Sequence, residues 1–166
     1  MSDTGRDMAG EKRRRGVYRW SKLNGRSILI FGIIGCVIGL IALSFEGILI
    51  GILIASAGWI ELQGYHKLVD NSADAGKWLM GGEGFLLVVI FIYALMHFLA
   101  LDPDQAINLL SPDAQSLLLE SGGIPPEVLN DMIYTAYRWL YLGLIIGTLV
   151  YQGGMVVYYY LKTRDM

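Results

Sequence analysis

Three long and nearly uncharged apolar stretches constrain this chain more than any other feature of its sequence. Residues 28–60, 78–101 and 132–161 each contain a single Asp, Glu, Lys or Arg. Apolar runs of about 18 residues or more are typical of transmembrane helices. A chain of 166 residues is too short to enclose three such runs in a soluble core. The sequence therefore predicts an all-α integral membrane protein.

The first stretch, residues 28–60, is too long for one membrane crossing. As a single helix it would extend about 50 Å at about 1.5 Å per residue, whereas the hydrocarbon core is about 30 Å thick. The sequence Ser44-Phe45-Glu46-Gly47 places a charge beside a glycine in the middle of this stretch, which favours a break. We therefore expect a tight helical hairpin here and four transmembrane helices in all, at about 26–44, 47–63, 78–101 and 131–161.

The distribution of positive charge favours four helices over three. Eight Lys or Arg residues precede the first span, Lys67 and Lys77 lie between the second and third, and Lys162 and Arg164 end the fourth, whereas residues 102–130 have none. With four helices, every basic segment lies on one side, as the positive-inside rule requires. We expect both termini in the cytoplasm of a bacterial-type inner membrane. A cleaved signal peptide is the competing interpretation, but a second apolar arm follows almost at once and favours an anchor.

The chain is expected to divide into a basic cytoplasmic arm (1–25), a membrane domain (26–162) and a short cytoplasmic tail (163–166). Residues 1–12 are polar, and we expect disorder there. Basic residues interleaved with aromatic ones follow, a pattern typical of binding to anionic lipids on the cytoplasmic side. The candidate lipid-anchoring residues are Arg13, Arg14, Arg15, Arg19 and Trp20. Membrane topology accounts for this charge, so a nucleic-acid partner is not expected.

The outer segment, residues 102–130, carries clear helix punctuation. Asp102-Pro103 and Ser111-Pro112 each place a capping residue before a proline, and Gly122-Gly123 provides a stop. Pro125-Pro126-Glu127 then begins the helix that enters the fourth span. We expect a short helical cap on the outer face, and the segment is acidic because it has no Lys or Arg.

Polar residues inside membrane spans are the first candidates for function. Glu61, Glu83 and Gln152 fall toward the cytoplasmic ends of their helices and would converge at one depth if those helices adjoin. Paired carboxylates can share a proton or bind a cation. The alternative is that both glutamates reach interfacial water or pair with Lys67 and Lys77.

A second polar pair, His97 and Arg138, is expected near the outer helix ends. Arg138 would neutralise nearby acids such as Asp131 and Glu127 or extend to the interface, and His97 would be a packing residue. Small residues spaced for close helix contact are expected either within the chain or between subunits. These candidate packing residues are Gly35, Gly39, Gly47, Gly51, Gly143 and Gly147.

No pattern in the sequence supports an enzyme, a metal site or a cofactor. The topology places the two histidines, His66 and His97, on opposite sides of the membrane, so they cannot share a haem. Cys36 has no partner for a disulfide, and phosphate-loop, zinc, dinucleotide and nucleophile-elbow motifs are absent. We expect a structural or interaction subunit of a homo-oligomer or of a larger membrane complex. The alternative is a small oligomeric ion channel or transporter that uses its intramembrane acids.

Overall fold

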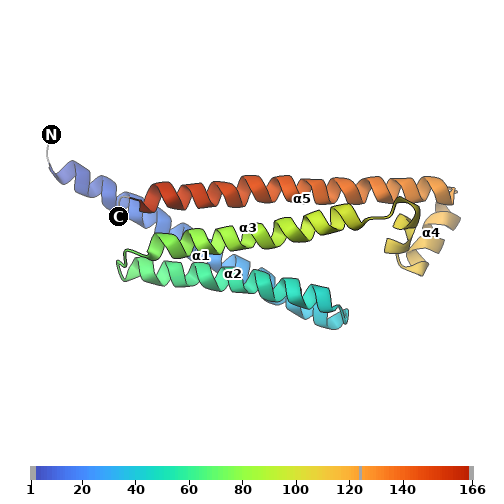
Figure 1. The fold of residues 1–166 in the computed structure, drawn as a ribbon, viewed down its shortest axis with the longest axis horizontal. Coiled ribbons are helices and arrows are strands. Elements are labelled where there is room, and N and C mark those ends of the chain that lie inside the picture. The colour runs from blue at the N-terminus through green and yellow to red at the C-terminus, as the bar shows by residue number, and fades with distance from the viewer. Residues whose placement is uncertain (1–2, 124, 165–166) are drawn as a thin grey trace. The chain divides into compact units, whose positions relative to one another are not determined.

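The computed structural model describes residues 3–123 and 125–164, without the side chains of residues 3–15, 104, 105 and 120–122. Over these residues the chain is helical and contains no strand. The elements are α1 (Asp3–Ile41), α2 (Phe45–Val69), α3 (Ala75–Ala100), the 3₁₀ helix η1 (Pro103–Leu109), α4 (Pro112–Gly122) and α5 (Pro126–Thr163) (Figure 1). Four of these helices are long and apolar enough to cross a membrane, over Gly16–Ile41, Phe45–Val69, Ala75–Ala100 and Pro126–Thr163. The predicted all-α fold with four membrane-spanning helices is confirmed.

The helix ends differ from those predicted because the helices continue beyond their apolar parts. α1 begins at Asp3, so the polar residues for which we expected disorder are helical from there onward. α2 continues to Val69 rather than 63, and α5 begins at Pro126 rather than 131. Lys, Arg, Glu and Gln favour helix nearly as well as Leu. A helix therefore does not stop where its residues cease to be apolar.

The breaks between helices occur at the predicted turn and cap residues. Ser44 caps α2, and its Oγ accepts a hydrogen bond from the Gly47 amide at 3.1 Å. Asn71 adopts a positive φ of 55° in the connection between α2 and α3. Ser111 caps α4, and Gly123, the residue after its end, has a φ of 57°. The two serines accept hydrogen bonds from amides that helix starts leave unpaired, and Gly123 provides the left-handed conformation that is common after a helix end.

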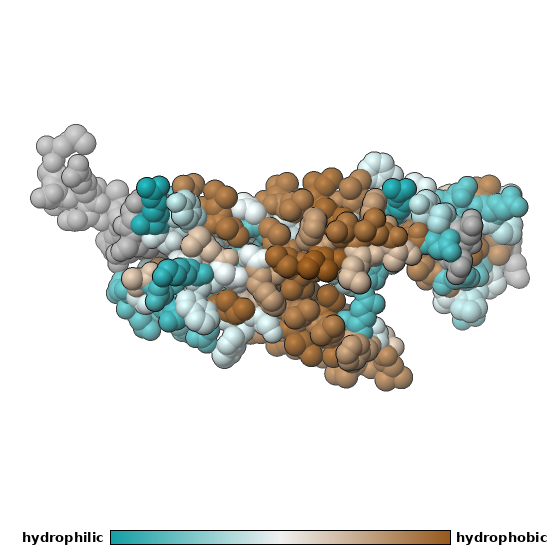
Figure 2. Space-filling view, viewed as in Figure 1, coloured by the Kyte–Doolittle hydropathy of each residue, from teal (hydrophilic) through white to brown (hydrophobic). Residues whose placement is uncertain are grey.

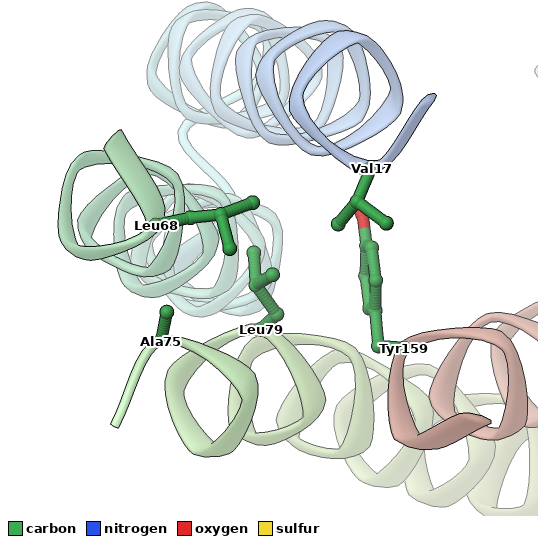
Figure 3. Packing of buried hydrophobic residues seen from close by; sticks show 5 residues of the cluster. All are labelled: Val17, Leu68, Ala75, Leu79 and Tyr159. Carbon is green, nitrogen blue, oxygen red and sulfur yellow. The ribbon is translucent and has the colours of Figure 1, made fainter. Parts of the chain in front are cut away.

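The contacts divide the chain into two compact units, one containing residues 1–89 and 149–166 and the other residues 90–148. In the first unit, α1 and α2 run side by side, joined by residues 42–44 (Figure 1). The start of α3 and the end of α5 complete this unit. Its buried hydrophobic cluster contains Val17, Leu68, Ala75, Leu79 and Tyr159. Figure 3 shows Leu68 and Leu79 pointing toward each other and the ring of Tyr159 pointing toward α1.

Glycines allow α1 and α2 to approach at backbone distance. A Cβ added at Gly32 would collide with the backbone of Ala55, and one added at Gly51 would lie 2.8 Å from Cys36 Sγ and 2.9 Å from Cys36 Cα. Real Cβ atoms do not approach other atoms so closely, so a larger side chain at either position requires the two helices to separate. This close contact is the packing that small residues at regular helical spacing permit.

The six candidate packing glycines fall into two groups. Gly35, Gly39, Gly47 and Gly51 lie in the α1–α2 contact, where, for example, a Cβ at Gly39 would lie 2.5 Å from Ile48 N. Gly143 and Gly147 lie on α5, and a Cβ at either would meet no described atom within 4 Å. The second pair therefore does not mediate packing within the part of the chain that the structure describes.

In the second unit, polar side chains fix the helical insert to the start of α5. Asn130 Oδ1 accepts a hydrogen bond from Ile107 N at 2.8 Å, and Asn130 Nδ2 donates to Pro103 O. Gln115 Nε2 donates to the carbonyls of Ile107 and Leu110. Apolar side chains of the insert differ in burial, since Ala106 is buried whereas Leu117 is 67% exposed.

The distribution of hydrophobic residues on the surface fits helices that contact lipid. Exposed large apolar side chains occur along all four long helices, including Phe31 on α1, Ile52 on α2, Ile92 on α3 and Val150 on α5. Figure 2 shows hydrophobic residues over the middle of the long helices on the drawn face. Hydrophilic residues gather near the α2–α3 connection in one unit and over the insert in the other.

Candidate functional site

Buried polar side chains from four helices meet in the first unit. On α1, the buried residues Val17, Ser21, Asn24 and Ile28 follow helical spacing and therefore share one face. Glu61 of α2 and Glu83 of α3 each lie about 12 Å along their helix from the α2–α3 connection at about 1.5 Å per residue. The two carboxyl groups therefore reach the same depth, as the sequence predicts for adjoining helices.

Close approach of α2 and α3 brings the two glutamates together. A Cβ added at Gly64 would lie 2.8 Å from Leu79 N, and one added at Gly82 would lie 3.0 Å from Glu61 N. Each of these glycines lies close in sequence to one of the acids. Gly82 therefore allows α2 and α3 to approach closely at the level of the carboxyl groups, whereas a Cβ at Gly81 or Gly84 would meet no described atom within 4 Å.

Asn24 connects the two acids. Its Nδ2 donates to Glu61 Oε1 at 3.1 Å, to Glu61 Oε2 at 3.0 Å and to Glu83 Oε1 at 2.5 Å. Tyr159 OH donates to Glu61 Oε1 at 2.5 Å, and Tyr151 OH donates to Asn24 Oδ1 at 3.2 Å. Both glutamates are 0% exposed. We call Glu61 and Glu83 the acid pair, and we call these two residues with Asn24, Tyr151, Gln152 and Tyr159 the polar cluster.

No described lysine or arginine forms an ion pair with either member of the acid pair. Lys77 Nζ instead pairs with Asp74 Oδ1 at 2.9 Å, and Lys67 Nζ lies 5.3 Å from the ring centroid of Trp78. The expected alternative, in which the glutamates reach water or pair with these lysines, is therefore wrong. Two adjacent carboxylates without a counter-ion are unfavourable in an apolar bundle.

Two buried oxygens of the polar cluster lack a hydrogen-bond partner among the described residues. They are Glu83 Oε2 and Gln152 Oε1. Gln152 is only 7% exposed. Buried polar atoms are almost always satisfied, and leaving one unsatisfied costs about 1–3 kcal/mol. Glu83 Oε2 can therefore bind a proton, whereas the amide oxygen of Gln152 can only accept a hydrogen bond.

The predicted outer residues make separate contacts in the second unit. His97 Nδ1 lies 3.0 Å from Tyr93 O, and its ring stacks on Tyr141 with centroids 5.2 Å apart. The Arg138 guanidinium lies 4.8 Å from the ring centroid of Phe98, and its Nη1 donates to Tyr134 OH at 3.3 Å. Arg138 thus contacts aromatic rings rather than Asp131 or Glu127, and its expected extension to the membrane interface stays a prediction.

The remaining predicted residues are placed only in part. Arg19 and Trp20 are exposed on α1, whereas the side chains of Arg13, Arg14 and Arg15 lie outside the described residues. Among the described residues, no group of three or more His, Cys, Asp or Glu is arranged to hold a metal ion. Of the predicted polar residues, Glu61 and Glu83 are the pair that a common hydrogen-bond partner joins in the described part of the chain.

Three members of the polar cluster were not predicted from the sequence. Asn24 lies outside the predicted first span, which begins at 26, and Tyr159 lies at the cytoplasmic end of the predicted fourth span, where tyrosine is typical of the membrane interface. Tyr151 lies among apolar residues of the fourth span. Helical spacing provides the missing signal. Ser21, Asn24 and Ile28 share one face of α1, and Gln152 and Tyr159 share one face of α5.

The polar cluster provides two carboxyl groups, one shared amide donor and two phenol donors within a helical bundle. Such a group of side chains can hold a proton between the carboxyl groups and release it when a neighbouring group moves. Comparisons of the chain with protein families, with curated proteins and with solved structures find no match.

Proposed function

We propose that this protein is an integral membrane protein that binds and exchanges a proton at the acid pair, and that it acts as a small proton-coupled channel or transporter. One observation carries the proposal. The single amide of Asn24 donates to both buried carboxyl groups, and no described cation neutralises them. The acid pair therefore needs one positive charge from elsewhere.

A proton meets this need with the smallest penalty. As a general scale, two unit negative charges 4 Å apart repel by about 4 kcal/mol at an effective dielectric constant of about 20. One shared proton removes this repulsion. The donors around Glu61, from Asn24 and Tyr159, favour its charged form, whereas Glu83 Oε2 has no described partner. We therefore assign the exchangeable proton to Glu83.

The charge distribution supports one orientation. We propose that α1 and α2 form a helical hairpin across a bacterial-type inner membrane, with both termini in the cytoplasm, where the basic residues of α1 contact anionic lipids. The acid pair would then lie in the cytoplasmic half of the bilayer. Glu61 is about 24 Å along α2 from Phe45, most of the roughly 30 Å hydrocarbon thickness.

Proton flux into liposomes tests the function. Purified protein is reconstituted with a pH-sensitive dye inside, and the rate of internal acidification is measured after an external pH step with valinomycin present. We expect Glu83→Gln to reduce the flux at least tenfold, because the amide cannot bind and release the proton. Glu127→Gln, which makes the same change at an exposed site on α5, is the matched control and should retain the flux.

Folding must be checked in the same preparations. Circular dichroism and gel filtration should give the same profile for Glu83→Gln and for the unmodified protein. Equal flux for both, with both folded, would contradict the proposal. So would a flux in the unmodified protein no greater than in empty liposomes.

A second candidate function, a structural or interaction subunit of an assembly, is favoured by a different observation. Gly143 and Gly147 are spaced for close helix contact but meet no described atom of their own chain within 4 Å. We propose that they contact another subunit. Gly147→Leu should then lower the oligomeric state measured in nanodiscs, whereas the same substitution at exposed Ile146 should not. An unchanged oligomeric state, or a monomer before mutation, would contradict this candidate.

A further inference from the structure

A pocket of about 350 Å³ lies on the surface of the second unit beside Arg138. Its lining comes from the end of α3 and the first half of α5 and consists of Phe98, Tyr134, Thr135, Arg138, Trp139 and Leu142. The side chains of Thr135, Arg138 and Trp139 are exposed, so a molecule outside the protein can reach them. We call this pocket the arginine pocket.

Arg138 has no counter-ion among the described residues. It is the only Lys or Arg between residues 78 and 161, and an arginine side chain stays protonated and carries five N–H donors. Nη1 donates to Tyr134 OH at 3.3 Å, and the guanidinium otherwise contacts the rings of Phe98 and Tyr134. No described carboxylate forms an ion pair with it. The arginine pocket therefore presents an accessible positive charge whose remaining N–H donors have no described acceptor.

The acids that precede Arg138 on α5 do not neutralise it. Asp131 and Glu127 lie about 10.5 Å and about 16.5 Å before it along the helix at about 1.5 Å per residue. Both are exposed, and salt screens exposed charges over about 8–10 Å. These two acids therefore neither pair with the guanidinium nor strongly repel an anion that binds it.

The position of Arg138 along α5 places it at the level of lipid headgroups. Residues 139–161 contain no Asp, Glu, Lys or Arg, and at about 1.5 Å per residue this uncharged part of the helix is about 35 Å long. The hydrocarbon core is about 30 Å thick. When these residues cross the membrane, Arg138 lies at one edge of the hydrocarbon, where the phosphate groups of phospholipids begin.

The lining of the arginine pocket matches the chemistry of a phospholipid. Phosphate oxygens accept hydrogen bonds, and an arginine guanidinium binds them with paired, charge-assisted hydrogen bonds. Thr135 and Trp139 bring further hydrogen-bond donors, and no acid is among the described lining residues. Phe98 and Leu142 provide apolar surface for the start of an acyl chain.

We propose that the arginine pocket binds the phosphate group of an anionic phospholipid, with the Arg138 guanidinium donating to the phosphate oxygens. An anionic lipid is preferred over a zwitterionic one, because its headgroup has no cation of its own that competes with the guanidinium for the phosphate. The arginine pocket shares no residue with the polar cluster, and lipid binding transfers no proton. The inference therefore goes beyond the proposed proton exchange.

Quenching of Trp139 fluorescence measures which lipid occupies the arginine pocket. Trp20, Trp59 and Trp78, all exposed, are replaced by Phe, which leaves Trp139 as the only tryptophan. The protein is reconstituted in equal mixtures of phosphatidylglycerol and phosphatidylcholine in which one lipid or the other carries brominated acyl chains, so the bilayer charge stays constant. We expect occupancy by phosphatidylglycerol about fivefold above that by phosphatidylcholine, the factor that one cation near anionic lipid contributes.

Variants assign the preference to the guanidinium. Arg138→Gln should reduce the ratio of the two occupancies to about one. Arg164→Gln, the same change at an exposed position after the end of α5, is the matched control and should retain the ratio. Thr135→Glu is a second variant at an exposed position, where a carboxylate three residues before Arg138 can pair with it and should also abolish the preference. Gel filtration of each variant shows whether it is folded.

Three results would overturn the proposal. Equal quenching by the two brominated lipids in the protein with native Arg138 would mean that Trp139 contacts bulk lipid only. A preference that survives in folded Arg138→Gln or Thr135→Glu would exclude the guanidinium as its cause. Displacement of phosphatidylglycerol by inorganic phosphate at constant ionic strength would assign the pocket to a free anion. Quenching is measured without a pH gradient, so failure of this proposal and failure of proton exchange are distinguishable.

Discussion

Replacing Asn24 with Asp should be the most disruptive near-isosteric change in the membrane helices. In the native protein the Asn24 amide contacts three carboxylate oxygens of the acid pair. An amide nitrogen has two N–H donors. A hydrogen bond to charged Glu61 contributes about 1.5–3 kcal/mol, and one to protonated Glu83 contributes about 0.5–1.5 kcal/mol. The loss of both donors therefore lowers the free energy of unfolding by about 2–4.5 kcal/mol.

This loss is large compared with the total free energy of unfolding. Native proteins are stable by about 5–15 kcal/mol, so Asn24→Asp should remove a large fraction of the stability. The new carboxylate also places a third acid beside Glu61 and Glu83, which adds repulsion unless it takes up a proton. Asn108→Asp makes the same chemical change at an exposed position of η1 and should alter the unfolding free energy by about 0.5 kcal/mol or less.

A compensating substitution tests the reasoning more sharply than the single variant. Glu83→Gln in the Asn24→Asp background restores two acids and one amide in the same place. The double-mutant cycle, measured by unfolding in detergent micelles, should give a coupling free energy of about 2 kcal/mol or more. Additive effects, or an Asn24→Asp variant as stable as Asn108→Asp, would refute the assignment of Asn24 as the shared donor.

Other predictions follow from the packing and the surface charges. Gly51→Ala should lower the free energy of unfolding in detergent by about 1–3 kcal/mol, because the added Cβ forces α1 and α2 apart. Gly147→Ala is the control. Its Cβ would meet no described atom within 4 Å, so the free energy of unfolding should stay the same or rise slightly. Asn130→Leu should increase hydrogen exchange in η1, since the side chain holds two backbone groups of that helix; unchanged exchange would count against this role. The Lys77 ammonium hydrogen-bonded to Asp74 holds the pKa of that carboxyl below its usual range. The pair therefore stabilises the fold above that range and ceases to do so as the pH falls through the lowered pKa. A carboxyl NMR titration of Lys77→Ala should show the pKa of Asp74 returning to its usual range, and an unmoved midpoint would exclude the pair as the cause.

Much of the fold is predictable from the sequence because lipid imposes simple rules. The number of spans follows from the length of the apolar stretches, and the breaks follow from Ser44, Ser111 and Gly123. The ends of the helices are harder to predict, because the charged residues that precede residue 26 are also good helix formers. Hydropathy identifies where a helix is apolar, and it gives no information on where the helix begins or ends.

The candidate site is predictable only in part. Glu61 and Glu83 are conspicuous as acids in apolar helices, and their similar depth follows from counting residues. Asn24 and Tyr159 become site residues only through packing, because each also suits the membrane interface. The contact of Gly82 with the backbone of Glu61, which brings the acids together, depends on how α2 and α3 face each other. Hydropathy alone contains no information on that orientation.

Infrared spectroscopy of the reconstituted protein tests most directly whether the acid pair holds an exchangeable proton. A protonated carboxyl group has a C=O stretching band that a carboxylate lacks, and the band shifts when deuterium replaces hydrogen. We expect such a band at neutral pH in the unmodified protein, its shift in deuterated buffer, and its loss in Glu83→Gln but not in Glu127→Gln. A spectrum without a protonated carboxyl band at neutral pH, or a band that persists in Glu83→Gln, would contradict the assignment of a shared proton to this site.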